Sequence, residues 1–312
     1  MRYRKIKAAA CLILASAFPT GFAAATEPAS CQTVRISDVA WTDNQAINGF
    51  AEVILPALGY TPQVSVLSMQ IVLESMKNGE IDTHLDFWTP GADSLTDPYI
   101  ADKTVEKVQT NMTGAQYTLA VPTYLWDAGL KTFNDIPKFK EQLDGKIYGI
   151  EPGNDGNTIL LQLIKDDKFG LGSFELVESS EQGMLSQLTR MEKDKKAIVF
   201  LGWSPHPMNM QHDFKYLSGG EEFFGSESSG WTAARAGYTK ECPNVGKFLT
   251  NFTFDIDTLN EVMGSILNDG MSGKDAALKW LKANPSALDK WLDGVTTFDG
   301  QPGLDAARKS IE

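Results

Sequence analysis

Cysteine, histidine and basic residues are scarce in this chain of 312 residues. It has three cysteines, three histidines, and 28 Lys+Arg against 40 Asp+Glu. No block of basic residues stands out, so a surface that follows nucleic-acid phosphates is not expected. Metal-ligand spacings of His or Cys are missing too, so we predict neither a metal site nor a cofactor. After the first 25 residues no apolar run reaches the roughly 18 residues of a membrane span. The 42% hydrophobic and 22% charged content is typical of a folded globular protein.

The N-terminus has the pattern of a secretory signal peptide, which we place at residues 1–25. A basic segment, Met1–Lys7, precedes an apolar stretch, Ala8–Phe18, and Ala23–Ala25 offers a small-residue cleavage site. Pro19 and Gly21 end the apolar stretch too early for a transmembrane anchor. Cleavage removes four cations and no acid, which takes the net charge from −12 to −16. An acidic exported protein suits a cationic or neutral ligand better than an anion.

Two cysteines remain after signal removal, because Cys11 leaves with the leader. Exported chains seldom keep exposed thiols reduced, so we predict a disulfide between Cys31 and Cys242. The alternative is a pair of buried free thiols. A bridge would join the first residues of the mature chain to its last third.

Strand-like segments alternate with helical patterns through most of the mature chain, which indicates an α/β fold. The final part, from Val245 onward, is mostly helical in pattern. The expected strands are Thr33–Ser37, Gln63–Leu67, Ile81–Trp88, Gln116–Val121, Lys146–Ile150, Phe174–Val177 and Ala197–Trp203.

The length permits two domains, yet no linker rich in Pro, Gly or Ser separates two halves. Two lobes joined by crossing strands satisfy both observations. We assign residues 26–114 and 213–312 to one discontinuous lobe and 115–212 to the other. Gln116–Leu125 is the expected crossing strand, and Lys215–Gly220 the expected return.

Aromatic residues gather where ligands bind in open α/β sheets, beyond the carboxyl ends of strands. Trp41, Trp88 and Trp203 each follow or end a predicted strand, and Tyr117 lies in the predicted crossing strand. Any one of them alone could be an ordinary half-buried aromatic. Together they indicate an aromatic cage, the usual device for binding a quaternary ammonium group, which has no N–H to donate.

The candidate polar residues at the same rim are Asp43, Asn154 and Asp155. Glycine betaine carries a carboxylate, which needs cationic side chains or backbone N–H groups, whereas choline is a net cation with one hydroxyl. An acid beside the cage favours choline. Backbone donors cannot be seen in a sequence, so betaine is disfavoured and remains the alternative ligand.

Four segments carry a resemblance to a known family: Ser37–Asp43, Asp86–Pro90, Gly149–Asn154 and Leu201–Pro205. They resemble those of the periplasmic substrate-binding proteins of glycine betaine/choline ABC importers, most of all the choline-binding branch, and the similarity covers nearly all of the mature chain. The resemblance implies a two-lobe, type II-like periplasmic binding protein that holds its ligand in the interlobe cleft. It further implies a monomer that delivers choline to membrane permease subunits.

The resemblance also assigns roles to individual residues. The cage would consist of Trp41, Trp88, Tyr117 and Trp203, with Asp43 approaching the ammonium and Asn154 the choline hydroxyl. These six residues form the predicted ligand-binding site.

An enzyme, such as a choline-ester hydrolase, is the rival class. The chain has three histidines, His84, His206 and His212, and we interpret the last two as surface or helix-capping residues. No Gly-x-Ser-x-Gly motif occurs, and Glu151 with Asp155 is more readily a turn than a carboxylate pair. We therefore predict a protein with no catalytic residues. A structural interaction module, the third class, would expose aromatic patches without a concave pocket.

Overall fold

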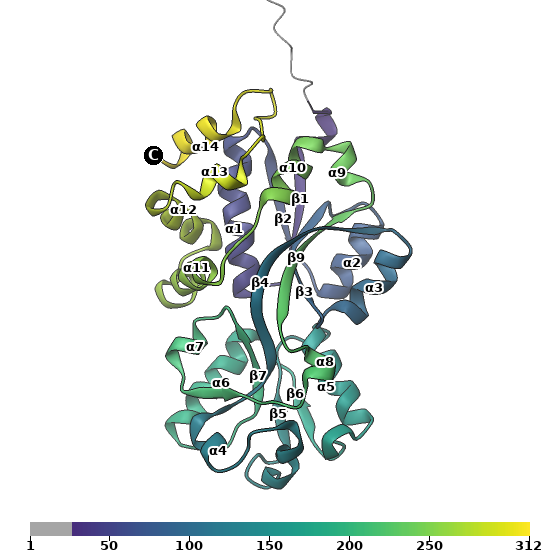
Figure 1. The fold of residues 1–312 in the computed structure, drawn as a ribbon, viewed down its shortest axis with the longest axis vertical. Helices are drawn as coiled ribbons and strands as arrows, with labels where there is room; N and C mark the ends of the chain where they lie inside the picture. Colours follow the sequence, from purple (N-terminus) through teal and green to yellow (C-terminus); the bar gives the residue numbers. More distant parts are fainter. Residues whose placement is uncertain (1–26) are drawn as a thin grey trace, which may run out of the picture.

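The computed structural model describes residues 27–312, so the predicted signal peptide lies outside the described residues. Within residues 27–312, none of the helices combines the length and the apolar character needed to cross a bilayer. The chain forms two lobes, one above the other in Figure 1, which we call the upper and the lower lobe.

The strands form one continuous arrangement in the order β2-β1-β3-β9-β4-β7-β5-β6, with β8 paired to β4. Strands β1 to β3 run parallel to one another, as do β5 to β7. The strand bounds are β1 Thr33–Asp38, β2 Thr61–Val66, β3 Thr83–Thr89, β4 Val105–Pro122, β5 Lys146–Tyr148, β6 Glu175–Val177, β7 Phe200–Ser204, β8 Phe214–Tyr216 and β9 Ser228–Arg235.

Strand β4 belongs to both lobes. Its first part pairs with β9 as far as Ala115 opposite Ser228, and from Gln116 onward it pairs with β7. Figure 1 shows it running from the upper lobe into the lower one. Tyr117 lies just past this change of partner, so the crossing strand delivers it to the boundary between the lobes.

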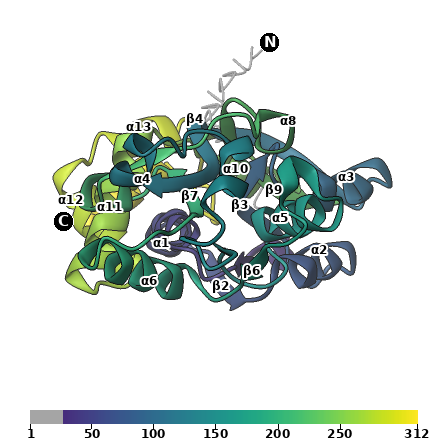
Figure 2. The ribbon, with the colours of Figure 1, turned by 90° about the horizontal axis from the view of Figure 1, so that it is seen from below.

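The helices cover both lobes. Figures 1 and 2 show α11, α12 and α13 on one side of the upper lobe and α2 and α3 on the other. The upper-lobe helices are α1 Thr42–Ala57, α2 Met69–Lys77, α3 Asp93–Ala101, α9 Tyr238–Glu241, α10 Pro243–Asn251, α11 Ile256–Asp269, α12 Gly273–Ala283, α13 Ala287–Trp291 and α14 Gly303–Ile311. Those of the lower lobe are α4 Thr123–Asp127, α5 Asp155–Lys165, α6 Glu181–Lys193, α7 Met208–Gln211 and α8 Glu221–Phe224. Short 3₁₀ turns are Ala29–Cys31, Phe133–Phe139 and Lys168–Gly170.

The predicted α/β class and the two-lobe fold are confirmed, and each expected strand has a counterpart. Sequence reasoning missed β9 and the first part of β4: the chain returns along β9, beside β4, and not at Lys215–Gly220, which pairs within the lower lobe. The lobe boundaries stay a prediction. Because β8 pairs with the end of β4, beside β7, we propose that the second lobe extends past residue 212 to about residue 227, before β9 begins at Ser228.

Helix α1 is fixed in the upper lobe by a close approach to α12. A Cβ added to Gly49 would lie 2.2 Å from the carbonyl oxygen of Gly273, so only glycine allows this spacing. Further along α1, the fully buried Phe50 packs on Trp280 and Trp291 with ring centroids 5.5 and 5.0 Å away. These contacts anchor the helix whose first turn reaches the site described below.

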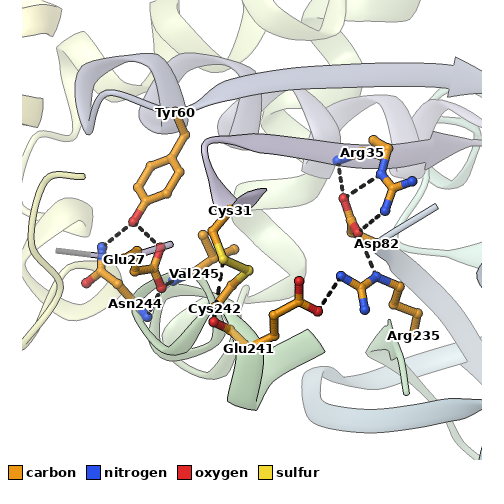
Figure 3. Close-up of a disulfide and its surroundings, with 10 residues drawn as sticks. All are labelled: Glu27, Cys31, Arg35, Tyr60, Asp82, Arg235, Glu241, Cys242, Asn244 and Val245. Carbon is orange, nitrogen blue, oxygen red and sulfur yellow. Dashed lines mark hydrogen bonds and ion pairs between the residues drawn. A yellow bond between two sulfur atoms is a disulfide. The ribbon is translucent and has the colours of Figure 1, made fainter. Parts of the chain in front are cut away.

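The predicted Cys31–Cys242 disulfide is present, with Cα atoms 5.6 Å apart. Figure 3 shows it in a cluster that also holds the start of the described chain, because Glu27 accepts hydrogen bonds from the Tyr60 hydroxyl at 2.6 Å and the Val245 N–H at 3.2 Å. The bridge joins the turn before β1 to the start of α10, at the end of the upper lobe far from the lower lobe (Figure 1).

Replacing both cysteines with alanine should lower the free energy of unfolding by about 2–4 kcal/mol, because the bridge closes a loop of 211 positions in the unfolded chain. Urea denaturation followed by tryptophan fluorescence measures this. Since the bridge is remote from the lower lobe, ligand affinity should stay within about twofold of wild type. An unchanged unfolding midpoint in the double variant would contradict the expectation.

Candidate functional site

A cavity lies at the boundary between the lobes, where about 290 Å³ of space, open solvent included, is not filled by protein atoms. Its walls come from the carboxyl ends of parallel strands in both lobes, after β1 and at the end of β3 above, and after β5 and at the end of β7 below, together with crossing strand β4. The lining residues are Trp41, Asp43, Trp88, Tyr117, Ile150, Asp155 and Trp203. Five of the six predicted site residues therefore meet at one cavity.

The four aromatic residues are buried, with 4–7% of their surface exposed. Tyr117 stands between two tryptophans: its ring centroid is 6.0 Å from that of Trp88 and 6.4 Å from that of Trp203. The ring planes meet at 65° and 88°, so the rings form separate walls rather than one stack. Walls inclined in this way can each present a π surface to the same cation.

The polar end of three of these rings is paired with a carboxylate. Trp88 Nε1 donates to Asp86 at 3.0 Å, and the Tyr117 hydroxyl lies 3.4 Å from an Asp155 oxygen. Trp41 Nε1 donates across the cleft to Glu151 of the lower lobe at 3.0 Å. Buried Tyr and Trp polar groups need such partners, and these contacts hold the rings in place.

The site is strongly acidic. Asp43 and Asp155 line the cavity with 3% and 2% exposure, Asp86 is fully buried behind Trp88, and no Lys or Arg is among the lining residues. Burial raises the pKa of Asp155 to about 6 and that of Asp86 to about 7, with the negative charge of Asp155 adding to the latter. Burial, together with the charges of Asp86 and Glu181, raises the pKa of Asp43 well above its usual range. A cation in the cavity would stabilise the ionised carboxylates.

Asn154, the sixth predicted site residue, does not line this cavity. It is the N-cap of α5: its side-chain oxygen accepts from the Asn157 N–H at 2.9 Å, and its amide donates to the Glu151 carbonyl. It lines a neighbouring hollow with Trp41 and Glu151. Its neighbour Asp155, which sequence reasoning noted as a candidate and left out of the site, faces the cavity instead. Contact of Asn154 with a ligand hydroxyl stays a prediction.

Sequence reasoning missed several residues that build the site. Ile150 lines the cavity, Phe224 packs on the Tyr117 ring with centroids 5.7 Å apart, and Gly156 makes room for Tyr117. A Cβ on Gly156 would lie 2.0 Å from the Tyr117 hydroxyl oxygen. Ile150 ends the predicted strand Lys146–Ile150, and Gly156 follows the predicted turn at Glu151 and Asp155. That turn was the sequence signal that could have identified both residues. Nothing in the local sequence around Phe224 points to the site.

Two helices begin at the cavity, yet their first N–H groups are used by the protein's own side chains. At α1, the Thr42 N–H donates to Glu181 at 2.9 Å and the Asn44 N–H to Asp43 at 2.9 Å. At α5, the Gly156 N–H donates to Asp155 at 2.9 Å, and Asn154 takes the Asn157 N–H. Helix N-termini otherwise bind anions, and these donors are already occupied.

Comparison with known proteins points to one family. A family described as the substrate binding domain of ABC-type glycine betaine transport systems matches residues 32–283. A glycine betaine/carnitine transport binding protein of Listeria monocytogenes is 35% identical over 160 residues, which cover 51% of this chain and 53% of that protein. An uncharacterised protein of Chromohalobacter salexigens is 42% identical over 47% of this chain and 95% of its own length.

Two solved structures extend the comparison over most of the chain. An ABC-transporter choline-binding protein in complex with choline is 49% identical, with a TM-score of 0.90, over 92% of this chain and 100% of that one. A lactococcal protein in its closed conformation, complexed with glycine betaine, is 26% identical, with a TM-score of 0.76, over 83% of this chain and 98% of that one. With the family match spanning most of its length, this chain belongs to the substrate-binding domains of ABC-type glycine betaine transport systems.

Proposed function

We propose that this protein binds choline in the cavity between its lobes and delivers it to an ABC importer. The observation that carries the proposal is the combination of four buried aromatic rings with two buried carboxylates, Asp43 and Asp155, around one cavity. Trimethylammonium is bulky, cationic and unable to donate hydrogen bonds, so aromatic surfaces and nearby acids are the groups that recognise it. The similarity to a choline-binding protein over nearly the whole chain supports the same ligand.

Choline fits this cavity better than glycine betaine does. A betaine carboxylate would lie among Asp43, Asp155 and, behind them, Asp86, with no Lys or Arg lining the cavity. The N–H groups at the starts of α1 and α5 that could have received it are taken by Glu181, Asp43, Asp155 and Asn154. Like charges against a ligand are an effective means of rejecting it. Glycine betaine, the ligand named for the family, stays the second candidate.

The structure offers little to a choline-ester hydrolase. A Ser–His contact exists between Ser37 Oγ and His84 Nδ1 at 2.9 Å, but both residues are fully buried and neither lines the cavity. A nucleophile must reach the reacting atoms to act. We propose a binding protein without enzymatic activity, as its transport relatives are.

We propose that this protein acts in the periplasm after removal of residues 1–25, because its relatives are transport binding proteins and its N-terminus has the pattern of a signal peptide. It would work as a monomer that closes on its ligand and docks on permease subunits. Residues from both lobes complete the cavity: Trp41, Asp43 and Trp88 come from above, and Asp155 and Trp203 from below. Small-angle scattering should therefore show compaction on adding saturating choline.

Calorimetry of the mature protein against choline, glycine betaine and proline betaine tests the function. Cation–π contacts contribute about 2 kcal/mol per desolvated aromatic face. Over four faces this is consistent with a binding free energy of about −8 kcal/mol, which corresponds to a choline Kd in the micromolar range. We expect choline to bind at least about tenfold more tightly than either betaine. Tighter binding of glycine betaine would reassign the ligand, and absence of binding to all three would overturn the function.

A further inference from the structure

Helix α1 has no side-chain cap of its own. Its N-cap residue is Trp41, whose side chain offers no acceptor and makes no cap hydrogen bond. By contrast, α5 is capped by Asn154 and α6 by Ser180. An acceptor for the first N–H of α1 must therefore come from elsewhere in the structure.

That acceptor is Glu181, the first residue of α6 in the lower lobe. One carboxylate oxygen accepts from the Thr42 N–H at 2.9 Å, and the other accepts from the Thr42 hydroxyl. Thr42 lies between Trp41 and Asp43, both of which line the cavity. In Figure 1 the lower end of α1 faces the lower lobe, to which α6 belongs. Glu181 of the lower lobe is thus hydrogen-bonded to the upper-lobe segment that carries two cavity-lining residues.

Glu181 is held ready for this contact from its own lobe. The Nε2 atom of His206 lies 3.1 Å from a Glu181 carboxylate oxygen. Because His206 Nδ1 accepts from the Met208 N–H at 3.0 Å, the ring proton is on Nε2 and can be donated to Glu181. The His206 ring in turn packs on Trp203, with centroids 4.8 Å apart. His206 thus accepts from the first N–H of α7 without being its N-cap, and it is buried, whereas the sequence suggested a surface or helix-capping residue. The contact therefore links the cage walls of both lobes.

Burial makes this arrangement depend on closure. Glu181 and Thr42 have 0% and 1% of their surface exposed. When the lobes separate, the Glu181 carboxylate loses both donors from Thr42, and the α1 N-terminus loses its acceptor and a favourable negative charge. Water can replace these partners only in the open form. The pair is formed in this structure, and separation of the lobes would break it.

We propose that Glu181 is a positioning residue that latches the closed cleft through Thr42 and so sets the rate at which bound choline escapes. The proposal rests on the proposed function, because it concerns retention of that ligand. Glu181 itself does not line the cavity, so its effect must pass through α1. A latch of this kind slows ligand release and leaves ligand entry into the open cleft unaffected.

The test is stopped-flow tryptophan fluorescence with choline on Glu181→Gln. Glutamine keeps the size, but its NH₂ group must replace one of two acceptors: the oxygen that faces both the Thr42 hydroxyl and His206 Nε2, or the oxygen that accepts from the Thr42 N–H. We expect the dissociation rate to rise about tenfold or more and the association rate to stay within twofold. The matched control is Glu192→Gln, a second acid of α6 paired with a histidine, His212 at 2.5 Å, inside the lower lobe. It should leave both rates unchanged.

Thr42→Ala tests the other end of the contact, and decides the matter if Glu181→Gln does not fold. It removes the hydroxyl donor and should also speed release, by about threefold or more, with the melting temperature of the ligand-free protein close to wild type. A dissociation rate within twofold of wild type in the folded variants, or a loss confined to association, overturns the latch. Failure of the wild type to bind choline would instead overturn the proposed function.

Discussion

Replacing Trp88 or Trp203 with alanine should weaken choline binding at least tenfold, an effect of about 1.4 kcal/mol or more. Each ring forms one wall of the cavity and is more than 90% buried, so its removal takes away a desolvated cation–π contact and admits water. Trp41→Ala should lose at least as much, because this ring also donates to Glu151 across the cleft. Calorimetry with choline gives the three affinities directly.

A matched control separates the cage from a general loss of tryptophan packing. Trp126 in α4 is half-buried, lies outside the cavity, and packs at the edge of the core with the Lys131 ammonium 6.0 Å from its ring centroid. Trp126→Ala should bind choline as the wild type does. Tyr117→Phe should be mild if the ring face alone recognises the ligand. Wild-type affinity in all three cage variants would end the aromatic-cage interpretation.

Choline binding should also weaken steeply in mild acid. In the ligand-free protein the pKa of Asp155 is about 6 and that of Asp86 about 7, because burial disfavours their charged forms. A bound cation favours the carboxylates and lowers those pKa values, so binding below pH 6–7 must release protons. Asp155 alone is about one-tenth ionised at pH 5, so the choline Kd should be about tenfold or more weaker at pH 5 than at pH 7.

The same pKa shifts determine whether the stability of the folded protein rises or falls with pH. Carboxyls whose folded pKa is raised contribute stability that is complete below their unfolded pKa, near 4, and is lost as pH rises through 6–7. A bound choline cation offsets the stability that is lost when these carboxyls ionise. Choline should therefore raise the melting temperature more at pH 8 than at pH 5. Asp155→Asn should weaken binding at pH 8 and flatten the dependence of Kd on pH. Equal wild-type affinities at pH 5 and pH 8 would contradict this account.

The cage residues could be predicted because their positions follow from local pattern. Trp41, Trp88 and Trp203 stand at the ends of strands that the sequence shows clearly, and parallel strands end at one edge of a sheet. The choice between Asn154 and Asp155 could not be made in the same way. Neighbouring residues at a helix start differ in direction by about 100°, and which of them caps the helix depends on backbone geometry.

The contacts between the lobes were out of reach for a related reason. Glu151 and Glu181 reach Trp41 and Thr42 over 110 and 139 positions of sequence, and no local period marks such partners. Strand β9 was missed because its first residues, Ser228 to Gly230, are small and polar, although all three lie in a sheet. Tertiary pairing overrides weak strand propensity there.

The pairing of Ala115 with Ser228 makes the lower lobe an insertion whose two ends are neighbours on adjacent antiparallel strands. The chain leaves the upper lobe and returns to it at one place, beside Tyr117. A short hairpin turn joining residues 115 and 228 would close the upper lobe on itself, with its disulfide and the anchored α1 intact. The cavity residues Trp41, Asp43 and Trp88 would then be presented on a smaller protein that lacks the lower lobe.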